Sequence, residues 1–362
     1  MSTIIFIEDS SKSLFGGGQK ISSIALEQFK KSGKRVIYID FVENTKLIAH
    51  LDTKRSKVLK LYHKGFYGPF GTLLQFIVLI PNFLVLAVTM RKEKNPVVYA
   101  TSKMGLVYGG TLALLLRVPY IYHAHMLLQG KVYDGVILFL MRNAKCCICV
   151  SDYVHLEFQK RGLKNGIVLD NPMDHVDLKN LKPKDLGVFR ALFIGSVIEI
   201  KGLKYLLDIF NIYSGSDIEI HVLGSGNLLN SYKQAYRSNS QIIFHGFVND
   251  VHYYLNKVAD VLVLPTVISE AAPTAIQQAM LHGVPVITTD IGGQRSFVDD
   301  GITGILVEPR SSKNILEAIL KMRDDLDFYD SLSFNCKEKA KGFRTIGDFE
   351  QGFLEIFTQA QL

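Results

Sequence analysis

Residues 260–309 read DVLVLPTVISEAAPTAIQQAMLHGVPVITTDIGGQRSFVDDGITGILVEP. Two apolar runs, Val261–Pro265 and Val284–Thr288, enclose a segment with the apolar spacing of a helix. We expect this helix to begin near Pro273, where the missing N–H of proline costs nothing, and to end before Gly283. The order strand, helix, strand predicts parallel strands that are covered on both faces.

The same alternation of short β-branched runs and longer helical patterns extends over the whole chain. It predicts an α/β protein made of two Rossmann-like domains, whose parallel sheets face each other across a cleft. The other predicted strands are Thr3–Glu8, Arg35–Asp40, Val97–Ala100, Tyr120–His123, Cys147–Val150, Ile167–Leu169, Ala191–Ile194, Ile218–Leu223, Ile242–Phe244 and Gly304–Val307.

The length of 362 residues suits two domains of ordinary size. The polar stretch Asp174–Gly187 divides the predicted strands into two halves. We therefore predict an N-terminal domain at 1–175 and a C-terminal domain at 176–345. Residues 346–362 are expected to form a helix that returns to the first domain.

Charge is unevenly distributed along the chain. Residues 1–180 hold 24 basic and 13 acidic side chains, a net +11, within a total of +7. This excess predicts an anionic partner for the first half, either a membrane surface, a diphosphate or nucleic acid. Nucleic acid is disfavoured because the basic residues lack interleaved aromatics on a recognisable module.

Cysteine usage gives no sign of an oxidising compartment. Cys146, Cys147 and Cys149 crowd into one apolar run, where neighbours point to opposite faces of a strand. No histidine lies near them at a metal-ligand spacing, so buried thiols are predicted. The opening residues lack a basic segment and a cleavage site, and they predict a first core strand.

Residues 72–90 form an uncharged stretch of 19 residues with basic residues on both sides. Its length could span a bilayer. However, Pro81 interrupts it, and positive charge on both flanks gives no orientation bias. Three interpretations stay open: a buried or groove-lining helix pair, a patch that dips into the membrane interface, and a true span.

Three turns after predicted strands carry the signals of an anion site. Gly195 follows one strand, and Lys201 lies within reach of that turn. Gly224 begins part of a dinucleotide fingerprint, but Leu229 stands where a small residue is required, which disfavours a nicotinamide site. The helix start after Pro273 offers free N–H groups, and Glu270 beside it could accept hydrogen bonds from sugar hydroxyls.

The order of these motifs resembles glycosyltransferase family 4. It comprises a strand with G-x-x-x-x-x-K-G, a strand with G-x-G, H-G-F-V, P-x-x-x-x-E, A-M-x-x-G-x-P-V-I, G-G and D-G-x-x-G-x-L-V. The resemblance implies that Lys201 contacts the donor diphosphate and that Glu270 binds the donor sugar. Gln278 stands at the place of the ribose-binding glutamate. Two further departures are Ser196, at a position that is arginine in the family, and Ser296, where glutamate is common.

The first half matches the family more loosely. Gly16, Gly17 and Gly18 resemble its N-terminal glycine loop, which approaches the donor phosphate and the acceptor. His123 resembles the histidine near the anomeric centre, with His125 as a substitute two positions on. The resemblance therefore implies the catalytic residues His123, Glu270 and Lys201, and donor contacts at Gly16, Gly17, Gly18, Gly195, Ser196, Lys201, Gly224, Thr274, Ala275 and Gln278.

The expected function is sugar transfer with retention at the anomeric carbon. The co-substrate would be a nucleotide-diphosphate sugar, without cofactor or metal, because no D-x-D stands at a suitable strand end. The resemblance and the charge imply a glycan or polyprenyl-diphosphate-linked acceptor in O-antigen, capsule or exopolysaccharide assembly. We expect a cytoplasmic protein at the inner face of the plasma membrane. The alternatives are a non-catalytic partner subunit of the GT-B fold and a sugar-nucleotide epimerase of that fold.

Overall fold

The computed structural model describes residues 2–8, 17–41, 45–51, 55–61, 69–128, 130, 133–173 and 187–360. The chain divides into two compact units. Unit 1 comprises Met1–Pro172 with Ile346–Leu362, and unit 2 comprises Met173–Thr345. The predicted polar divider lies, apart from Gly187, outside the described residues.

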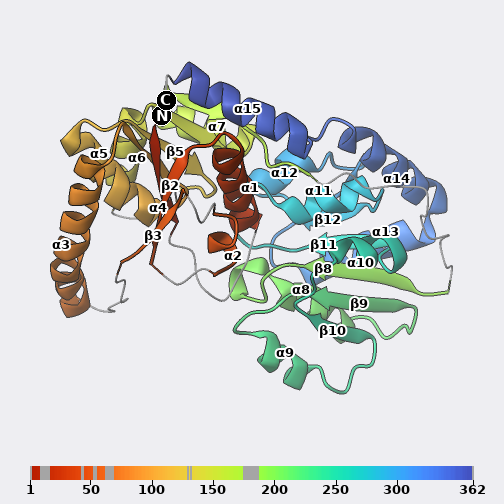
Figure 1. Cartoon of the computed structure of the whole chain (residues 1–362). Helices are drawn as coiled ribbons and strands as arrows, with labels where there is room; N and C mark the ends of the chain where they lie inside the picture. The colour runs from red at the N-terminus through yellow and green to blue at the C-terminus, as the bar shows by residue number, and fades with distance from the viewer. Residues whose placement is uncertain are drawn as a thin grey trace. The chain divides into compact units, whose positions relative to one another are not determined.

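Unit 1 is built on a seven-stranded parallel sheet in the order β3-β2-β1-β4-β5-β6-β7 (Figure 1). Its strands are β1 Thr3–Glu8, β2 Arg35–Asp40, β3 Lys57–Lys60, β4 Pro96–Ala100, β5 Tyr120–Ala124, β6 Cys146–Cys149 and β7 Gly166–Val168. Its helices are α1 Gly17–Lys31, α2 Thr45–Ile48, α3 Pro69–Lys92, α4 Lys103–Gly105, a π-helical turn Leu106–Gly110, α5 Thr111–Leu116, α6 Asp134–Asn143, α7 Asp152–Lys160 and α15 Ile346–Gln359.

Unit 2 repeats this plan with six parallel strands in the order β10-β9-β8-β11-β12-β13. Its strands are β8 Phe189–Ile194, β9 Ile218–Leu223, β10 Ile242–Gly246, β11 Val261–Leu264, β12 Val286–Thr289 and β13 Gly304–Val307. Its helices are α8 Leu203–Leu207, α9 Leu229–Ala235, α10 Val251–Lys257, α11 Thr274–Leu281, α12 Gly292–Phe297, α13 Ser312–Asp324 and α14 Leu326–Ala340, with 3₁₀ turns at Glu199–Lys201 and Asp208–Asn211.

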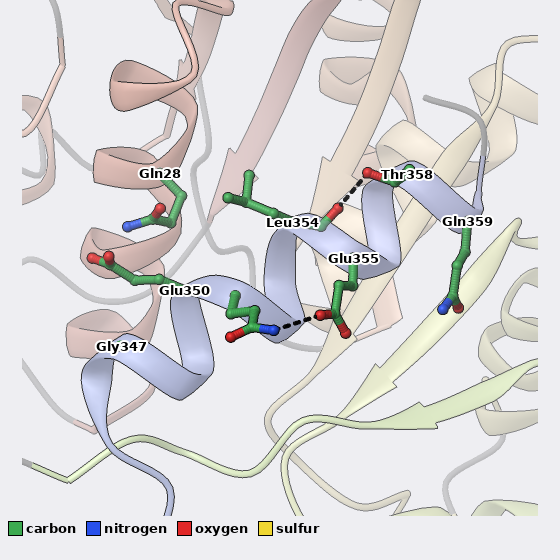
Figure 2. A pocket seen from close by; sticks show the side chains of 8 residues that line it. Gln28, Gly347, Glu350, Leu354, Glu355, Thr358 and Gln359 are labelled. Carbon is green, nitrogen blue, oxygen red and sulfur yellow. Dashed lines mark hydrogen bonds between the residues drawn. The ribbon is translucent and has the colours of Figure 1, made fainter.

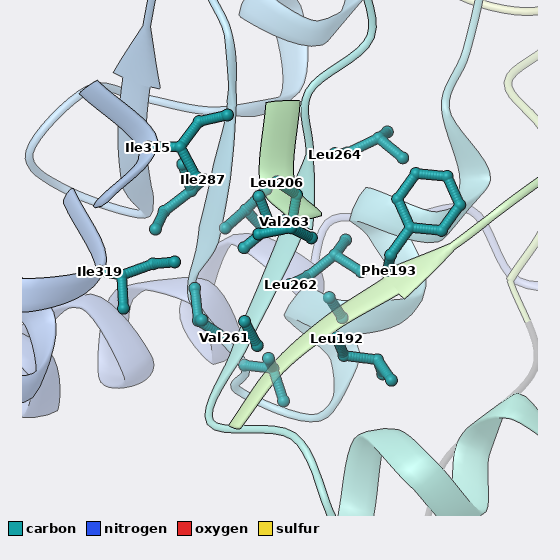
Figure 3. Packing of buried hydrophobic residues seen from close by; sticks show 14 of the residues in the cluster. Leu192, Phe193, Leu206, Val261, Leu262, Val263, Leu264, Ile287, Ile315 and Ile319 are labelled. Atoms are coloured by element: carbon teal, nitrogen blue, oxygen red, sulfur yellow. The ribbon is translucent and has the colours of Figure 1, made fainter. Parts of the chain in front are cut away.

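The central strands of unit 2 are apolar on both faces, as their sequences predict. Leu262 and Val263 of β11 are fully buried although they point to opposite sides of the sheet. Figure 3 shows Leu206 of α8 and Ile315 of α13 in the same cluster. Burial of this kind contributes about 25 cal/mol for each Å² of apolar surface removed from water.

The core of unit 1 includes the C-terminal helix α15. Its Phe353 and Phe357 rings lie 5.3 and 5.2 Å from the ring of Phe29 in α1. Phe353 also packs against Tyr99 of β4. The last helix is therefore a component of the unit that the first strand begins.

Two features of unit 1 differ from the sequence-based expectation. The sequence did not predict strand β3, because Lys57 and Lys60 flank only two apolar residues. This strand lies at the edge of the sheet, where charged side chains protect the unpaired backbone groups. The interpretation of residues 72–90 as a helix pair is wrong, since α3 continues through Pro81 as one helix. Proline removes one hydrogen bond and kinks a helix without having to end it.

The described residues contain no helix that combines the length and the apolar content needed to cross a membrane. The cysteines of β6 are buried and free, as predicted. Burial raises the pKa of both the Cys146 and the Cys149 thiol to about 12.

Unit 2 begins and ends at one place. The N–H of Met173 donates to the carbonyl of Arg344 over 2.9 Å. Met173 also forms an isolated parallel bridge with Thr345. The segments that enter and leave the unit are therefore hydrogen-bonded to each other.

Candidate functional site

The strand order of unit 2 determines where a ligand can reach the backbone. The connections run in opposite directions on either side of β8 and β11, so a crevice opens at the carboxyl ends of these two strands. Gly195 and Ser196 directly follow β8, and Pro265 directly follows β11. Two of the predicted donor residues of unit 2, Gly195 and Ser196, therefore lie at the switch point.

Lys201 is carried by a 3₁₀ turn that packs against the loop after β11. Gly202 has a φ of 64°, and a Cβ at this position would collide with the carbonyl oxygen of Pro265. The N–H of Val267 donates to the carbonyl of Ile200 over 2.9 Å. These backbone contacts fix the base of the Lys201 side chain beside β11.

The Lys201 and Glu270 side chains meet in an ion pair. The distance from Nζ of Lys201 to Oε2 of Glu270 is 2.6 Å, and the side chains are 21% and 17% exposed. The other carboxylate oxygen of Glu270 accepts a hydrogen bond of 2.7 Å from the Thr266 hydroxyl. The sequence predicted both members of the pair, and the structure brings them together.

Helix α11 begins four residues after Glu270. No side chain caps its first turn: the N-cap residue is Pro273, which carries no side-chain donor or acceptor for the role. Thr274 and Gln278 are half-buried and one turn apart on the same face. Ala275 follows Thr274 in the first turn. This helix start adds N–H groups and positive potential near the ion pair.

Gly224 has a packing role that the sequence did not indicate. A Cβ at this position would collide with the carbonyl oxygen of Gly195, and one at Gly226 would collide with that of Val197. The N–H of Val197 donates to the carbonyl of Ser225 over 2.9 Å. The turns after β8 and β9 are therefore packed backbone against backbone.

Sequence reasoning missed Gln294. It lies in α12, directly after the Gly292-Gly293 pair, and it is fully buried. Its Oε1 accepts from the N–H of Glu270 at 3.1 Å, and its Nε2 donates to the carbonyl of Ile268 at 3.1 Å. A buried amide that follows a glycine pair was the available signal.

In unit 1, Gly17 and Gly18 begin α1 after β1, while Gly16 lies outside the described residues. A Cβ at Gly18 would be 3.6 Å from the ring of His125. Glu8 at the end of β1 accepts from the Ser22 hydroxyl over 2.7 Å. Burial lowers the pKa of His125 to about 4, while the Glu8 carboxylate opposes this shift.

His123 lies within β5 and is fully buried. Its Nδ1 is 2.6 Å from the Tyr99 hydroxyl, and its ring is 6.5 Å from the Phe349 ring of α15. Burial and the nearby His125 ring hold its pKa well below the usual range. This is the environment of a neutral core histidine, whereas the half-buried His125, 4.2 Å away, lies beside the start of α1.

A groove of about 590 Å³ lies elsewhere on unit 1, between α1 and α15 (Figure 2). Gln28, Glu350 and Leu354 are among its lining residues. Gln28 stands near the far end of α1 from Gly18, so the groove is separate from the glycine start of that helix. No group of three metal-ligating side chains is found among the residues that the structure describes.

Comparison with known proteins adds to this geometry. Residues 189–325 match the family model described as Glycosyl transferases group 1. The chain is 25% identical to the Escherichia coli UDP-Gal:alpha-D-GlcNAc-diphosphoundecaprenol alpha-1,3-galactosyltransferase, over 90% of this chain and 94% of that protein. It is 24% identical to the Staphylococcus aureus capsular polysaccharide biosynthesis glycosyltransferase CapM, over 84% and 87% of the two chains.

A solved structure of Anabaena Alr3699/HepE in complex with UDP and glucose superimposes with a TM-score of 0.79 at 20% identity, covering 99% of this chain and all of that one. These matches support a glycosyltransferase with the GT-B fold. The lipopolysaccharide outer core galactosyltransferase WaaB, in its apo form, has the same fold, with a TM-score of 0.72 at 17% identity and full coverage of both chains. The related glycosyltransferases act in capsule, O-antigen and lipid-linked polysaccharide biosynthesis.

Proposed function

We propose that the chain is a retaining glycosyltransferase of family 4. It transfers a sugar from a nucleotide-diphosphate sugar to a lipid-linked saccharide in cell-surface polysaccharide assembly. The observation that carries the proposal is the Lys201–Glu270 pair at the carboxyl ends of β8 and β11, beside the start of α11. The named activity of the Escherichia coli relative supports the donor and acceptor classes.

Unit 2 is assigned to the donor. As the sugar leaves, negative charge grows on the diphosphate, and a lysine together with free helix N–H groups stabilises that charge most where water is scarce. Lys201 and the first turn of α11 are proposed for this role, so no metal is needed. Glu270 accepts hydrogen bonds from the donor sugar, and Gln278 meets the ribose without a charge.

Unit 1 is assigned to the acceptor. Gly17 and Gly18 at the start of α1 leave the backbone open to a phosphate. Of the two histidines we propose His125 for the position near the anomeric carbon. His125 is half-buried beside Gly18, while His123 is enclosed by Tyr99 and Phe349.

Transfer by the purified chain tests this proposal. We expect nucleotide sugars to raise the melting temperature and transfer to persist in EDTA. Glu270→Ala and Lys201→Ala should each lower turnover about a hundredfold, as loss of one preorganised charge contact does. The exposed pair Lys313–Glu317, at 3.8 Å, supplies matched controls, because alanine at either position should leave turnover unchanged.

The same assay separates the alternatives. Binding of nucleotide sugars without any transfer would identify a non-catalytic partner subunit. A changed sugar in the absence of an acceptor would identify an epimerase. Loss of activity in the Lys313 or Glu317 variants would show that the effect is not specific to the predicted site.

The membrane partner is proposed from α3. Ile80, Leu84 and Val88 are spaced by four residues and are 59%, 62% and 49% exposed, so they form one uncovered apolar stripe. Leu86 and Met90 on the opposite side are buried in unit 1. Helix α5 contacts α3 (Figure 1). Its Leu115 is also exposed, at 72%.

Basic residues continue this stripe. Arg91 and Lys92 are exposed at the next turn of α3, and Lys94 follows. The Glu93 side chain is only 17% exposed, because it pairs with Arg35 over 3.3 Å. An apolar face that ends in exposed cations fits an anionic bilayer surface. A second copy of this chain is disfavoured as the partner, because it would bring the same cations to the interface.

Flotation with vesicles tests this surface. We expect binding to vesicles that contain phosphatidylglycerol and weak binding to pure phosphatidylcholine. Arg91→Gln with Lys92→Gln should weaken binding about fivefold for each charge. Leu84→Gln should weaken binding to both compositions, and Phe334→Gln on α14, with a similarly exposed ring, should not. Equal binding by all variants would reject α3 as the contact surface.

A further inference from the structure

Glu270 is held at four points, and three of them do not involve Lys201. The carbonyl of Glu270 accepts from the N–H of Gly293 over 3.1 Å. Its N–H donates to Oε1 of Gln294, and its carboxylate accepts from Thr266. Lys201 provides the fourth contact.

The supports on both sides of Glu270 are buried. Gln294 and Thr266 are fully buried, and the carbonyl of Thr266 accepts from the Thr289 hydroxyl of β12 over 2.6 Å. Gly293 is required as well, because a Cβ there would collide with the carbonyl of Glu270. The backbone of the loop is thus bonded to α12 and β12, whereas Lys201 contacts only the carboxylate.

This difference has a consequence for donor binding. A diphosphate competes with Glu270 for the Lys201 ammonium, because both are anions. If Lys201 turns to the diphosphate, the hydrogen bonds with Gln294 and Gly293 still hold the Glu270 backbone, and the Thr266 hydroxyl still holds its carboxylate. The Gln294 side-chain amide makes two hydrogen bonds to the loop backbone: it accepts from the N–H of Glu270 and donates to the carbonyl of Ile268.

We propose that Gln294 is a positioning residue that keeps Glu270 directed at the donor sugar when Lys201 engages the diphosphate. The inference rests on the proposed function, because it assigns Glu270 to the sugar. Gln294 itself touches no substrate in this scheme. Its effect reaches the donor through the loop that bears Glu270.

Gln294→Met tests the proposal, because methionine keeps the volume and loses both hydrogen bonds. We expect affinity for the nucleotide sugar and kcat/KM for the donor to fall tenfold to a hundredfold, the range that small misplacement of a catalytic group produces. Affinity for the nucleotide diphosphate without the sugar should change less than about twofold, since its proposed contact is Lys201, to which Gln294 makes no hydrogen bond. A merely structural loss would weaken both ligands together.

Gln241→Met is the matched control. Gln241 also makes two side-chain hydrogen bonds to the backbone, in which its Nε2 donates to the carbonyls of Gly215 at 3.1 Å and Ile218 at 2.7 Å, but it lies at the amino end of β10. It should lose similar stability and no sugar affinity.

Hydrogen exchange provides a readout without any ligand. Amides 266–272 should exchange faster in Gln294→Met and not in Gln241→Met. Unchanged exchange, or equal losses of sugar nucleotide and bare nucleotide affinity, would overturn the positioning role. Absence of nucleotide-sugar binding by the unmodified chain, with faster loop exchange in the variant, would reject the proposed function and leave the loop support intact.

Discussion

Gly202 shows at the residue scale how a backbone conformation presents Lys201. Its φ of 64° lies in the left-handed region, and the carbonyl of Pro265 occupies the space where a Cβ would stand. A side chain here would meet two separate penalties, one conformational and one steric. The Lys201 turn therefore depends on a glycine for its contact with the loop after β11.

Gly202→Ala should lower the free energy of unfolding by at least about 2 kcal/mol, because the left-handed conformation costs about 1–2 kcal/mol and the collision adds to it. Urea denaturation measures the loss. Gly301→Ala is the control, since Gly301 has a φ of 71° and no atom within 4 Å of the place that a Cβ would take. Equal losses in both variants would show that packing against Pro265 contributes nothing.

The residue scale also separates what the sequence could predict from what it could not. Lys201 and Glu270 belong to sequence motifs whose residue spacing identifies them as candidates, and in the structure they form an ion pair. His123 lies in β5 and His125 follows its end two positions on, so spacing alone could not tell which is enclosed. Helix α15, which begins 221 residues after His125, packs its Phe349 ring near His123. Gln294 depends in the same way on a hydrogen bond to a loop 24 residues away.

Helix α15 shows at the element scale how the last segment stabilises the first unit. Phe353 is buried among Phe29, Tyr99, Phe349 and Phe357. Leu354 is the next residue, yet it is 44% exposed. One helix thus carries an aromatic face and a solvent face on neighbouring positions.

Phe353→Ala should destabilise the protein by about 3–5 kcal/mol, because it leaves a cavity in an aromatic cluster. Leu354→Ala should change stability by less than about 0.5 kcal/mol, as surface substitutions do. Guanidinium unfolding of the two variants measures both values. A small effect of Phe353→Ala would mean that α15 packs only weakly on unit 1.

Among the elements, long apolar strands were predicted to within about two residues, because burial on both faces leaves a continuous signal. Edge strand β3 has no such signal, since its side chains are half exposed. The continuity of α3 was hidden by Pro81, whose local cost is offset by burial of Leu86 and Met90. Local rules failed where tertiary contacts decided the outcome.

At the scale of the whole molecule, several histidines are held neutral by burial. The pKa of His123 and of His245 is lowered, and burial together with the neighbouring His252 lowers the pKa of His282 to about 4. Asp250 opposes the shift of His282. Below the ordinary histidine pKa of 6.5, the unfolded chain therefore binds more protons than the folded chain does.

Stability should accordingly fall as pH decreases from 6.5 toward 4, by up to about 1.4 kcal/mol per pH unit for a buried histidine and by less for His245, which solvent partly screens. Melting temperatures at pH 7 and pH 5 test the direction. His282→Gln should reduce the slope, because glutamine takes up no proton. A melting temperature that is constant over this range would contradict the neutral state of these side chains.

The hydrogen bond between Met173 and Arg344 gives unit 2 the topology of an insertion, with its entrance and exit at neighbouring points of the chain. Such a segment can be removed or replaced as a single cassette, because the flanking ends of unit 1 need only a short peptide to rejoin. Recombination between related genes could therefore exchange the strand-end residues of unit 2 without altering the fold of unit 1. Under the proposed assignment, donor preference and acceptor preference would be inherited separately.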